Sequence, residues 1–183
     1  MIANYPITWI LMEVISVILM VLCMVHALKS DRPKQKVFEL CCFVLAALFE
    51  HVGVLGGNYW YSQERIMMFG LIPLSILMIE AVIMYSAMTL FEYTNMPKWS
   101  IIWFVGFLST IQDMTIDPVY VNDTYVFDGI AQGHWNWSIY YEPTFFGIPF
   151  FNFSSWFFMT GIYAGMLLLG RHIYEKKKKN GLK

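Results

Sequence analysis

Five carboxylates lie in apolar segments of this chain that contain no lysine or arginine. They are Glu13, Glu50, Glu80, Asp113 and Asp117. A charged side chain costs ~2.5–3.5 kcal/mol at the centre of a membrane-spanning helix, so each of these acids needs a reason to be retained. Their presence indicates chemistry on a molecule that is dissolved in the membrane.

The composition sets the class of protein. Hydrophobic residues make up 58% of the 183 residues and charged residues only 14%, whereas soluble domains carry about 25% charge. Runs without lysine or arginine approach the ~20 residues that cross a bilayer. We predict an all-α integral membrane protein, a single domain over residues 1–183 that forms a bundle of about five transmembrane helices with one long external loop. The predicted spans are 8–28, 37–57, 66–90, 99–117 and 144–170, and the loop is 118–143.

The basic residues predict the orientation. Twelve lysines and arginines are present, and all but Arg65 lie on the cytoplasmic side if the N-terminus is outside. Five spans then place the C-terminus and the lysine run 176–179 in the cytoplasm of a multi-pass cell-membrane protein. We expect this run to contact anionic lipid headgroups, and we expect no nucleic-acid partner.

The acids are predicted to share a depth in the membrane. Counted at ~1.5 Å per residue, Glu13, Glu50, Asp113 and Asp117 lie near the outer surface, and Glu80 lies nearer the mid-membrane. Asp113 and Asp117 are four residues apart and share one helix face. Acids that lie close together in a water-poor site can hold a proton at neutral pH, as a proton donor must. Four acids at one level therefore favour a functional site.

Small residues and a proline predict local structure. Gly53 with Gly57, and Gly161 with Gly165, form pairs four residues apart that allow another helix to approach closely. Pro118 disfavours helix at the residue before it, so we predict that the fourth span ends there.

The predicted loop 118–143 is acidic and aromatic. A connection longer than ~12–15 residues is usually functional or disordered. Its tryptophans and tyrosines favour a folded cap at the membrane interface.

Four motifs occur in order along the chain. They are E-x-x-G…G-x-Y-x-Y from Glu50, D-x-x-x-D-P from Asp113, W-x-W from Trp135 and G-I-P-x-x-N-F-x-x-W from Gly147. In this order they resemble the membrane carotenoid hydratase family, which includes bisanhydrobacterioruberin hydratase. The resemblance covers residues 45–160, and the ordered set is more specific than any single motif.

The resemblance implies an enzyme that adds water across a terminal isoprenoid double bond. The product is a tertiary alcohol, and no organic cofactor is needed. This chain departs from the family pattern at Glu80, where a bulky apolar or aromatic residue is expected, so the identity of the substrate stays open.

The residues permit that chemistry. Hydration of such an alkene needs a desolvated acid, stabilisation of a tertiary cation, and a base that takes a proton from water. Asp113 or Asp117 is the candidate acid, and its partner or Glu50 would orient the water. Aromatic faces could stabilise the cation, and Asn152 could hold the water or the product hydroxyl. The candidate substrate-binding residues are Tyr59, Tyr61, Trp135, Trp137, Asn152, Trp156 and Glu80.

Three other interpretations remain. For the hydratase, the partner is a lipophilic polyprenoid in the bilayer. In the first alternative, a related enzyme uses the same acids to act on the prenyl chains of membrane ether lipids. A non-catalytic small membrane protein or proton-relay transporter could also use them, although no inverted repeat supports transport. A haem or metal site would draw on histidines, but two of these lie at cytoplasmic helix ends, so no metal or cofactor is expected. The histidines are His26, His51, His134 and His172.

Overall fold

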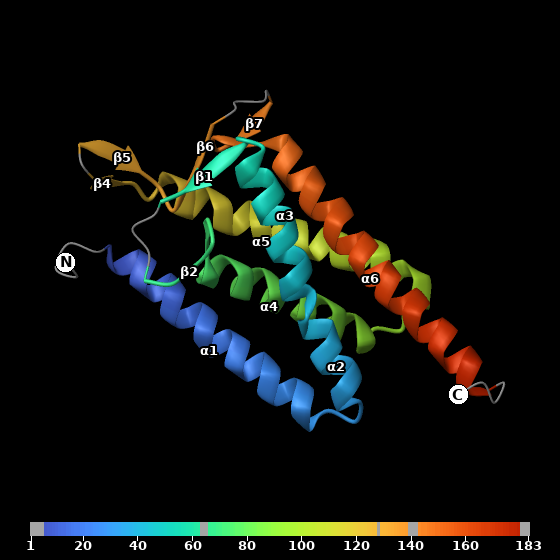
Figure 1. Cartoon of the computed structure of the whole chain (residues 1–183). Coiled ribbons are helices and arrows are strands. Elements are labelled where there is room, and N and C mark those ends of the chain that lie inside the picture. Colours follow the sequence, from blue (N-terminus) through green and yellow to red (C-terminus); the bar gives the residue numbers. More distant parts are fainter. Residues whose placement is uncertain (1–5, 63–65, 128, 139–142, 180–183) are drawn as a thin grey trace.

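The chain folds as a bundle of long helices. The computed structural model describes residues 6–62, 66–127, 129–138 and 143–179. In Figure 1 the labelled strands β1, β4, β5, β6 and β7 gather at one end of the bundle, and the C-terminus lies at the other end. The helices are α1 (Ile7–Lys29), α2 (Pro33–Leu40), α3 (Cys42–Leu55), α4 (Leu74–Glu92), α5 (Ile101–Asn122) and α6 (Phe150–Lys179), with a short 3-10 helix η2 (Lys98–Ser100) before α5.

Long apolar helices indicate a membrane protein. Within the described residues, four helical segments are long and apolar enough to cross a bilayer, and they fall on the first, second, third and fifth predicted spans. These segments are Ile7–Lys29, Pro33–Leu55, Leu74–Glu92 and Phe150–Lys177. The second contains α2 and α3, which are separated at Cys41.

The fourth predicted span falls on α5, which has 22 residues but is not among these four segments. Gln112 and two aspartates lower its hydropathy, so the count of five spans stays a prediction.

The predicted helix end before Pro118 is wrong. Helix α5 continues through Pro118 to Asn122. Proline lacks one backbone N–H, but it does not prevent the following residues from keeping helical geometry. Asn122 Nδ2 then donates a hydrogen bond to the Pro118 carbonyl oxygen at 2.7 Å, which supports the last turn.

Short antiparallel ribbons, which the sequence analysis did not predict, occupy the connections between helices. The predicted cap 118–143 therefore contains the last helical turn of α5, the β4–β5 hairpin and strand β6. Residues 128 and 139–142 of that cap, like Arg65, lie outside the described residues. The ribbons are β1 (Tyr59–Tyr61) with β6 (Trp135–Trp137), β2 (Met68–Phe69) with β3 (Ile72–Pro73), β4 (Tyr125–Phe127) with β5 (Ile130–Gln132), and β7 (Thr144–Phe145) with β8 (Ile148–Pro149).

Glycines bring α5 and α6 together, as the pair Gly161 and Gly165 predicts. A Cβ atom at Gly161 would lie 2.6 Å from the Ile102 carbonyl oxygen, and one at Gly165 would lie 3.0 Å from the Ile102 side chain. On the facing helix, a Cβ at Gly106 would lie 2.7 Å from the Phe157 carbonyl oxygen. Larger residues at these positions would push the two backbones apart.

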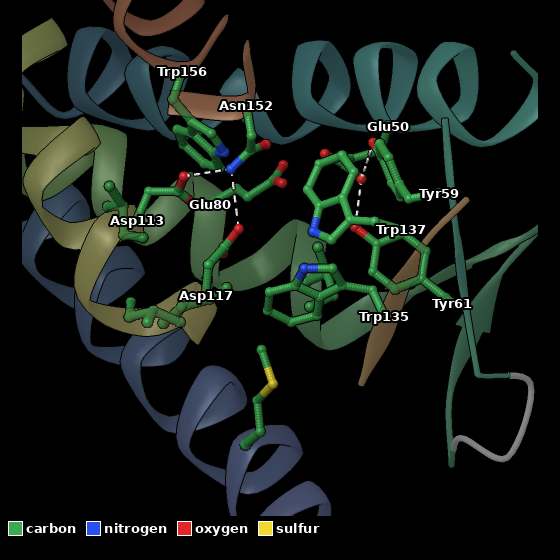
Figure 2. Close-up of a pocket in the computed structure, with 15 residues that line it drawn as sticks. Glu50, Tyr59, Tyr61, Glu80, Asp113, Asp117, Trp135, Trp137, Asn152 and Trp156 are labelled. Atoms are coloured by element: carbon green, nitrogen blue, oxygen red, sulfur yellow. Dashed lines mark hydrogen bonds between the residues drawn. The ribbon is translucent and has the colours of Figure 1, made fainter. Parts of the chain in front are cut away.

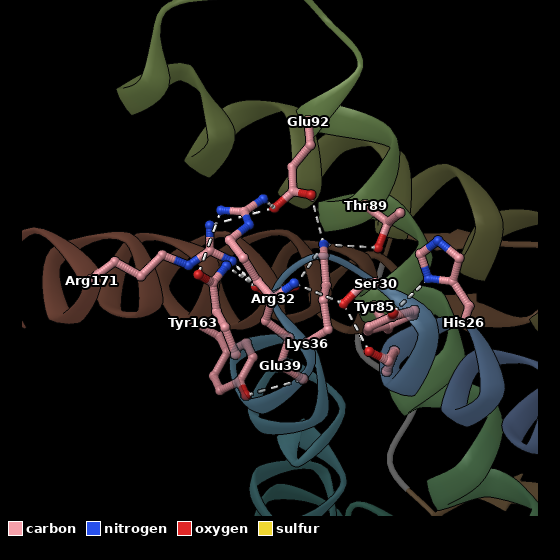
Figure 3. Close-up of polar contacts among 12 residues, drawn as sticks. His26, Ser30, Arg32, Lys36, Glu39, Tyr85, Thr89, Glu92, Tyr163 and Arg171 are labelled. Carbon is pink, nitrogen blue, oxygen red and sulfur yellow. Dashed lines mark hydrogen bonds and ion pairs between the residues drawn. The ribbon is translucent and has the colours of Figure 1, made fainter.

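An ion network ties α2, α4 and α6 together (Figure 3). It lies at the end of the bundle opposite the labelled ribbons of Figure 1. Lys36 Nζ lies 3.0 Å from Glu39 Oε2 and 2.8 Å from Glu92 Oε2. Arg171 contacts Glu39 and Glu92, and Arg32 lies 3.2 Å from Glu92. Lys36 and Glu39 are almost completely buried. Some of the basic residues that predict the cytoplasmic side therefore also hold α2, α4 and α6 together.

Candidate functional site

All ten predicted site residues line one pocket at the ribbon end of the bundle (Figure 2). Helices α3, α4, α5 and α6 contribute to it near the ends that face the ribbons, and the β1–β6 ribbon forms one wall. The ten residues are Glu50, Tyr59, Tyr61, Glu80, Asp113, Asp117, Trp135, Trp137, Asn152 and Trp156. Their gathering in one place is a finding, and their catalytic and binding roles stay predictions.

One side of the pocket is an aspartate pair held by an amide. Asp113 and Asp117 are buried, lie one turn apart on α5, and are within hydrogen-bonding reach of each other. Asn152 Nδ2, from the first turn of α6, donates hydrogen bonds to Asp113 Oδ2 at 2.8 Å and to Asp117 Oδ2 at 3.0 Å. The amide thus fixes one oxygen of each aspartate as an acceptor and joins α6 to α5 at the site.

The opposite side is a glutamate held by two tyrosines. Tyr59 and Tyr61 each donate a hydrogen bond to Glu50 Oε2, at 2.8 and 2.5 Å. Burial raises the pKa of both tyrosines well above the usual value for a phenol, and the adjacent Glu50 raises it further. The two hydroxyls therefore stay protonated and act as donors to the glutamate.

Glu80 connects the two sides. Its carboxyl group is buried, lies within hydrogen-bonding reach of Glu50, and interacts electrostatically with both aspartates. The sequence analysis places it nearer the mid-membrane, because the third predicted span starts at residue 66. Helix α4 starts at Leu74, so Glu80 lies less than two turns inside it, level with the other acids.

Glu13 is not part of this group, although the sequence analysis places it at the depth of Glu50 and the aspartates. Met12 of α1 lines the pocket, whereas the next side chain on a helix points about 100° away. Glu13 is buried, and its Oε1 accepts a hydrogen bond from the Ile66 backbone N–H at 3.1 Å. The pocket acids are therefore Glu50, Glu80 and the aspartate pair.

The Y-x-Y and W-x-W motifs face each other across the β1–β6 ribbon. Tyr59 pairs with Trp137 and Tyr61 pairs with Trp135, with ring centroids 5.0 and 6.2 Å apart. Alternate residues of a strand point to the same face, so the ribbon presents all four rings to the pocket. The period-two spacing within each motif indicates that its two rings share one strand face, but it does not indicate which strand pairs with which.

The prediction that Gly53 and Gly57 form a helix-packing motif is wrong. A Cβ atom at Gly53 would lie 2.7 Å from Tyr59 Cε1, so this glycine makes room for the tyrosine ring that reaches Glu50. Gly57 lies in the turn after α3 with φ +73°, a conformation that favours glycine. Both glycines therefore shape the return of the chain from α3 to β1.

Apolar lining residues on α4 were missed by the sequence analysis. Ile76, Ile79 and Ile83 line the pocket together with Glu80, at the i, i+3, i+4, i+7 spacing of one helix face. Ile116 of α5 adds to the same apolar wall. Spacing alone could not select this face, because α4 is apolar all round.

The pocket is small and acidic. Its cavity of about 50 Å³ exceeds the ~10–15 Å³ that one water molecule needs. Four carboxyl groups line it, and no lysine, arginine or histidine of the described residues does. The site can therefore hold water beside several proton donors and acceptors under an aromatic wall.

The described histidines lie away from this lining. His51 Nδ1 lies 2.7 Å from the Ala47 carbonyl oxygen on its own helix, and His26 Nδ1 lies 2.7 Å from the Tyr85 hydroxyl. His134 is fully buried, with its ring centroid 4.7 Å from that of Trp9 and 4.5 Å from that of Tyr120.

A family model described as carotenoid biosynthesis protein matches residues 7–182, which include every residue of the pocket. Comparisons with curated proteins and with solved structures gave no match.

Proposed function

Because the chain belongs to the carotenoid biosynthesis protein family, we propose that it is a membrane hydratase that acts in carotenoid biosynthesis. It adds water across a terminal prenyl double bond of a polyprenoid and forms a tertiary alcohol. The observation that carries this proposal is the group of four carboxyl groups around one small, aromatic-walled cavity. Acidic side chains in hydrocarbon carry a cost in free energy. A shared role in proton transfer accounts for the presence of all four.

The aspartates supply proton transfer at one side of the cavity. Hydration needs one group to give a proton to the alkene and another to take a proton from the attacking water. Asp113 and Asp117 lie within hydrogen-bonding reach of each other, so the pair can share one proton and pass it on. Glu50, fixed by its two tyrosine donors, helps to orient the water from the other side.

The aromatic wall suits the cation that forms between these steps. Protonation of a trisubstituted alkene leaves a tertiary carbocation, which is attracted to the faces of aromatic rings by ~2 kcal/mol or more in a desolvated site. Trp135, Trp137 and Trp156 line the cavity, and the faces of their rings can stabilise the cation as it forms. The ribbon thus favours the charged transition state over the neutral alkene.

The cavity size limits what enters. A volume of about 50 Å³ admits water and part of a prenyl end, so the rest of a long polyene would extend along the apolar helix surfaces in the bilayer. This arrangement recognises the end of a polyprenoid and tolerates variation in the remainder of the molecule.

Comparison of lipid extracts tests the proposal. Membranes from cells with and without the gene are analysed by mass spectrometry for a polyprenoid that is heavier by one water and depends on the gene. Glu50→Gln, Asp113→Asn and Asp117→Asn serve as variants that should lose the product. A gene-dependent hydrated ether lipid would move the substrate to the prenyl chains of membrane lipids. No gene-dependent hydrated product in either lipid class would refute the hydratase proposal and favour a non-catalytic role.

A further inference from the structure

Four carboxyl groups surround the pocket, and we propose that Glu80 is the one that protonates the alkene. This inference rests on the proposed hydratase function. Glu80 is almost completely buried, and its Oε2 has no hydrogen-bond partner among the described residues. Figure 2 shows the Glu80 carboxyl pointing into the pocket between Glu50 and Asn152. An unpaired buried oxygen is costly, which a role at the reacting atoms would explain.

The other three carboxyl groups each have an oxygen that is fixed as an acceptor. Asn152 donates to one oxygen of Asp113 and of Asp117, and two tyrosine hydroxyls donate to Glu50 Oε2. An oxygen that accepts a hydrogen bond from this amide does not also carry a proton, so each aspartate takes up a proton on its other oxygen. Glu80 Oε2 accepts no such hydrogen bond from the described residues. This oxygen is therefore free to carry the proton that the alkene receives.

The tyrosines also determine which glutamate of the pair donates a hydrogen bond to the other. An oxygen that accepts two O–H donors cannot hold the proton itself, so a proton on Glu50 belongs on Oε1. Glu50 lies within hydrogen-bonding reach of Glu80 and can therefore donate to the carboxylate that Glu80 becomes. A chain of donors thus runs from Tyr59 and Tyr61 through Glu50 to Glu80, and each link strengthens the next. Glu50 acts through Glu80 as a positioning residue.

The steps balance in atoms and protons. The Oε2–H bond of Glu80 breaks, and a C–H bond forms at the less substituted alkene carbon, which leaves a tertiary cation. A water oxygen then bonds to the cation and gives one proton to the pair of Asp113 and Asp117. Proton transfer across the pocket, from the aspartate pair to Glu80, restores the starting state. The net change is the addition of one water, without an oxidant or reductant.

Deuterium incorporation separates the proton donor from the base. Wild-type protein, Glu80→Gln and Asp113→Asn are reconstituted in lipid vesicles in D₂O with lycopene, an acyclic carotenoid with an unmodified prenyl double bond at each end. A parallel set uses an unsaturated prenyl ether lipid. Glu80→Gln should lose about 10²–10⁴-fold in hydration rate and should return alkene without deuterium. Asp113→Asn should also hydrate slowly but should return alkene that carries deuterium, because the cation forms and then loses a proton again.

Two further variants distinguish a loss of catalysis from a folding defect. Glu13→Gln removes a buried acid outside the pocket and should hydrate like the wild type. Glu80→Asp keeps an acid with a shorter reach and should retain deuterium incorporation at a reduced rate, even where Glu80→Gln inserts poorly.

Hydration by Glu80→Gln at the wild-type rate would overturn the inference and leave the hydratase function standing. Deuterium incorporation by Glu80→Gln but not by Asp113→Asn would also overturn it, and would make the aspartates the donors. Wild-type protein that hydrates neither lipid would remove the proposed function and this inference together.

Discussion

Replacement of Lys36 by methionine should destabilise the folded protein without changing the rate of the proposed hydration reaction. The Lys36 ammonium is buried and lies 3.0 Å from Glu39 Oε2, 2.8 Å from Glu92 Oε2 and 3.3 Å from Thr89 Oγ1. Methionine has a similar length and no charge, so Lys36→Met roughly keeps the volume. Two carboxylates then lose the cation that they share.

The expected cost depends on the burial of this network. Removal of one partner from a buried ion pair destabilises a protein by ~3–5 kcal/mol. Arg171 still contacts both Glu39 and Glu92, so we expect the lower end of that range. At ~2–4 °C per kcal/mol for a chain of this size, a loss of ~3 kcal/mol lowers the Tm by ~6–12 °C.

Thermal unfolding of the detergent-solubilised protein, followed by tryptophan fluorescence, measures this shift. Lys34→Met is the matched control, because Lys34 is exposed on the same helix and its loss should change stability by less than ~0.5 kcal/mol. Lys36→Met should keep its hydration rate below the transition, since the pocket lies at the other end of the bundle. Equal Tm values for the two variants would refute the proposed contribution of the network.

Three further predictions concern the site and the topology. Asp113→Asn should lower the hydration rate by ~10²–10⁴-fold in a protein that still inserts; normal activity in a direct assay would exclude proton transfer by this residue. Gly53→Ala should displace the Tyr59 ring, which its Cβ would meet at 2.7 Å, and the loss of one hydrogen bond to the Glu50 carboxyl group should cost ~0.5–1.5 kcal/mol in the activation free energy measured from kcat/KM. Gly170→Ala, where a Cβ meets nothing within 4 Å, should leave kcat/KM unchanged. A reporter inserted near Asp123 should be external and one at the C-terminus cytoplasmic; both on one side would contradict the five-span topology.

The sequence determined the class of the protein, its family and the polar and aromatic residues of the pocket. Apolar runs of bilayer length predict long helices, because a backbone in hydrocarbon must satisfy its own hydrogen bonds. The family resemblance drawn from the ordered motifs is confirmed by the match over residues 7–182. The spacing of Asp113 and Asp117 placed both acids on one helix face, where the structure has them. The class and the shared face of the aspartates needed only apolar run lengths and the helical period, whereas the family rests on the resemblance of the ordered motifs.

Only the tertiary structure decided how the acids are grouped. Glu80 lines the pocket with the other acids and Glu13 does not, contrary to the prediction. The start of α4 depends on the β2–β3 hairpin before it, and the direction of a side chain on α1 depends on its neighbours. The pairing of β1 with β6 joins Tyr59 to Trp137, far apart in the sequence, so no local pattern fixes it. Gly53 faces a tyrosine and not a helix for the same reason. Local periodicity sets which residues share a face, but contacts between distant segments set what that face meets.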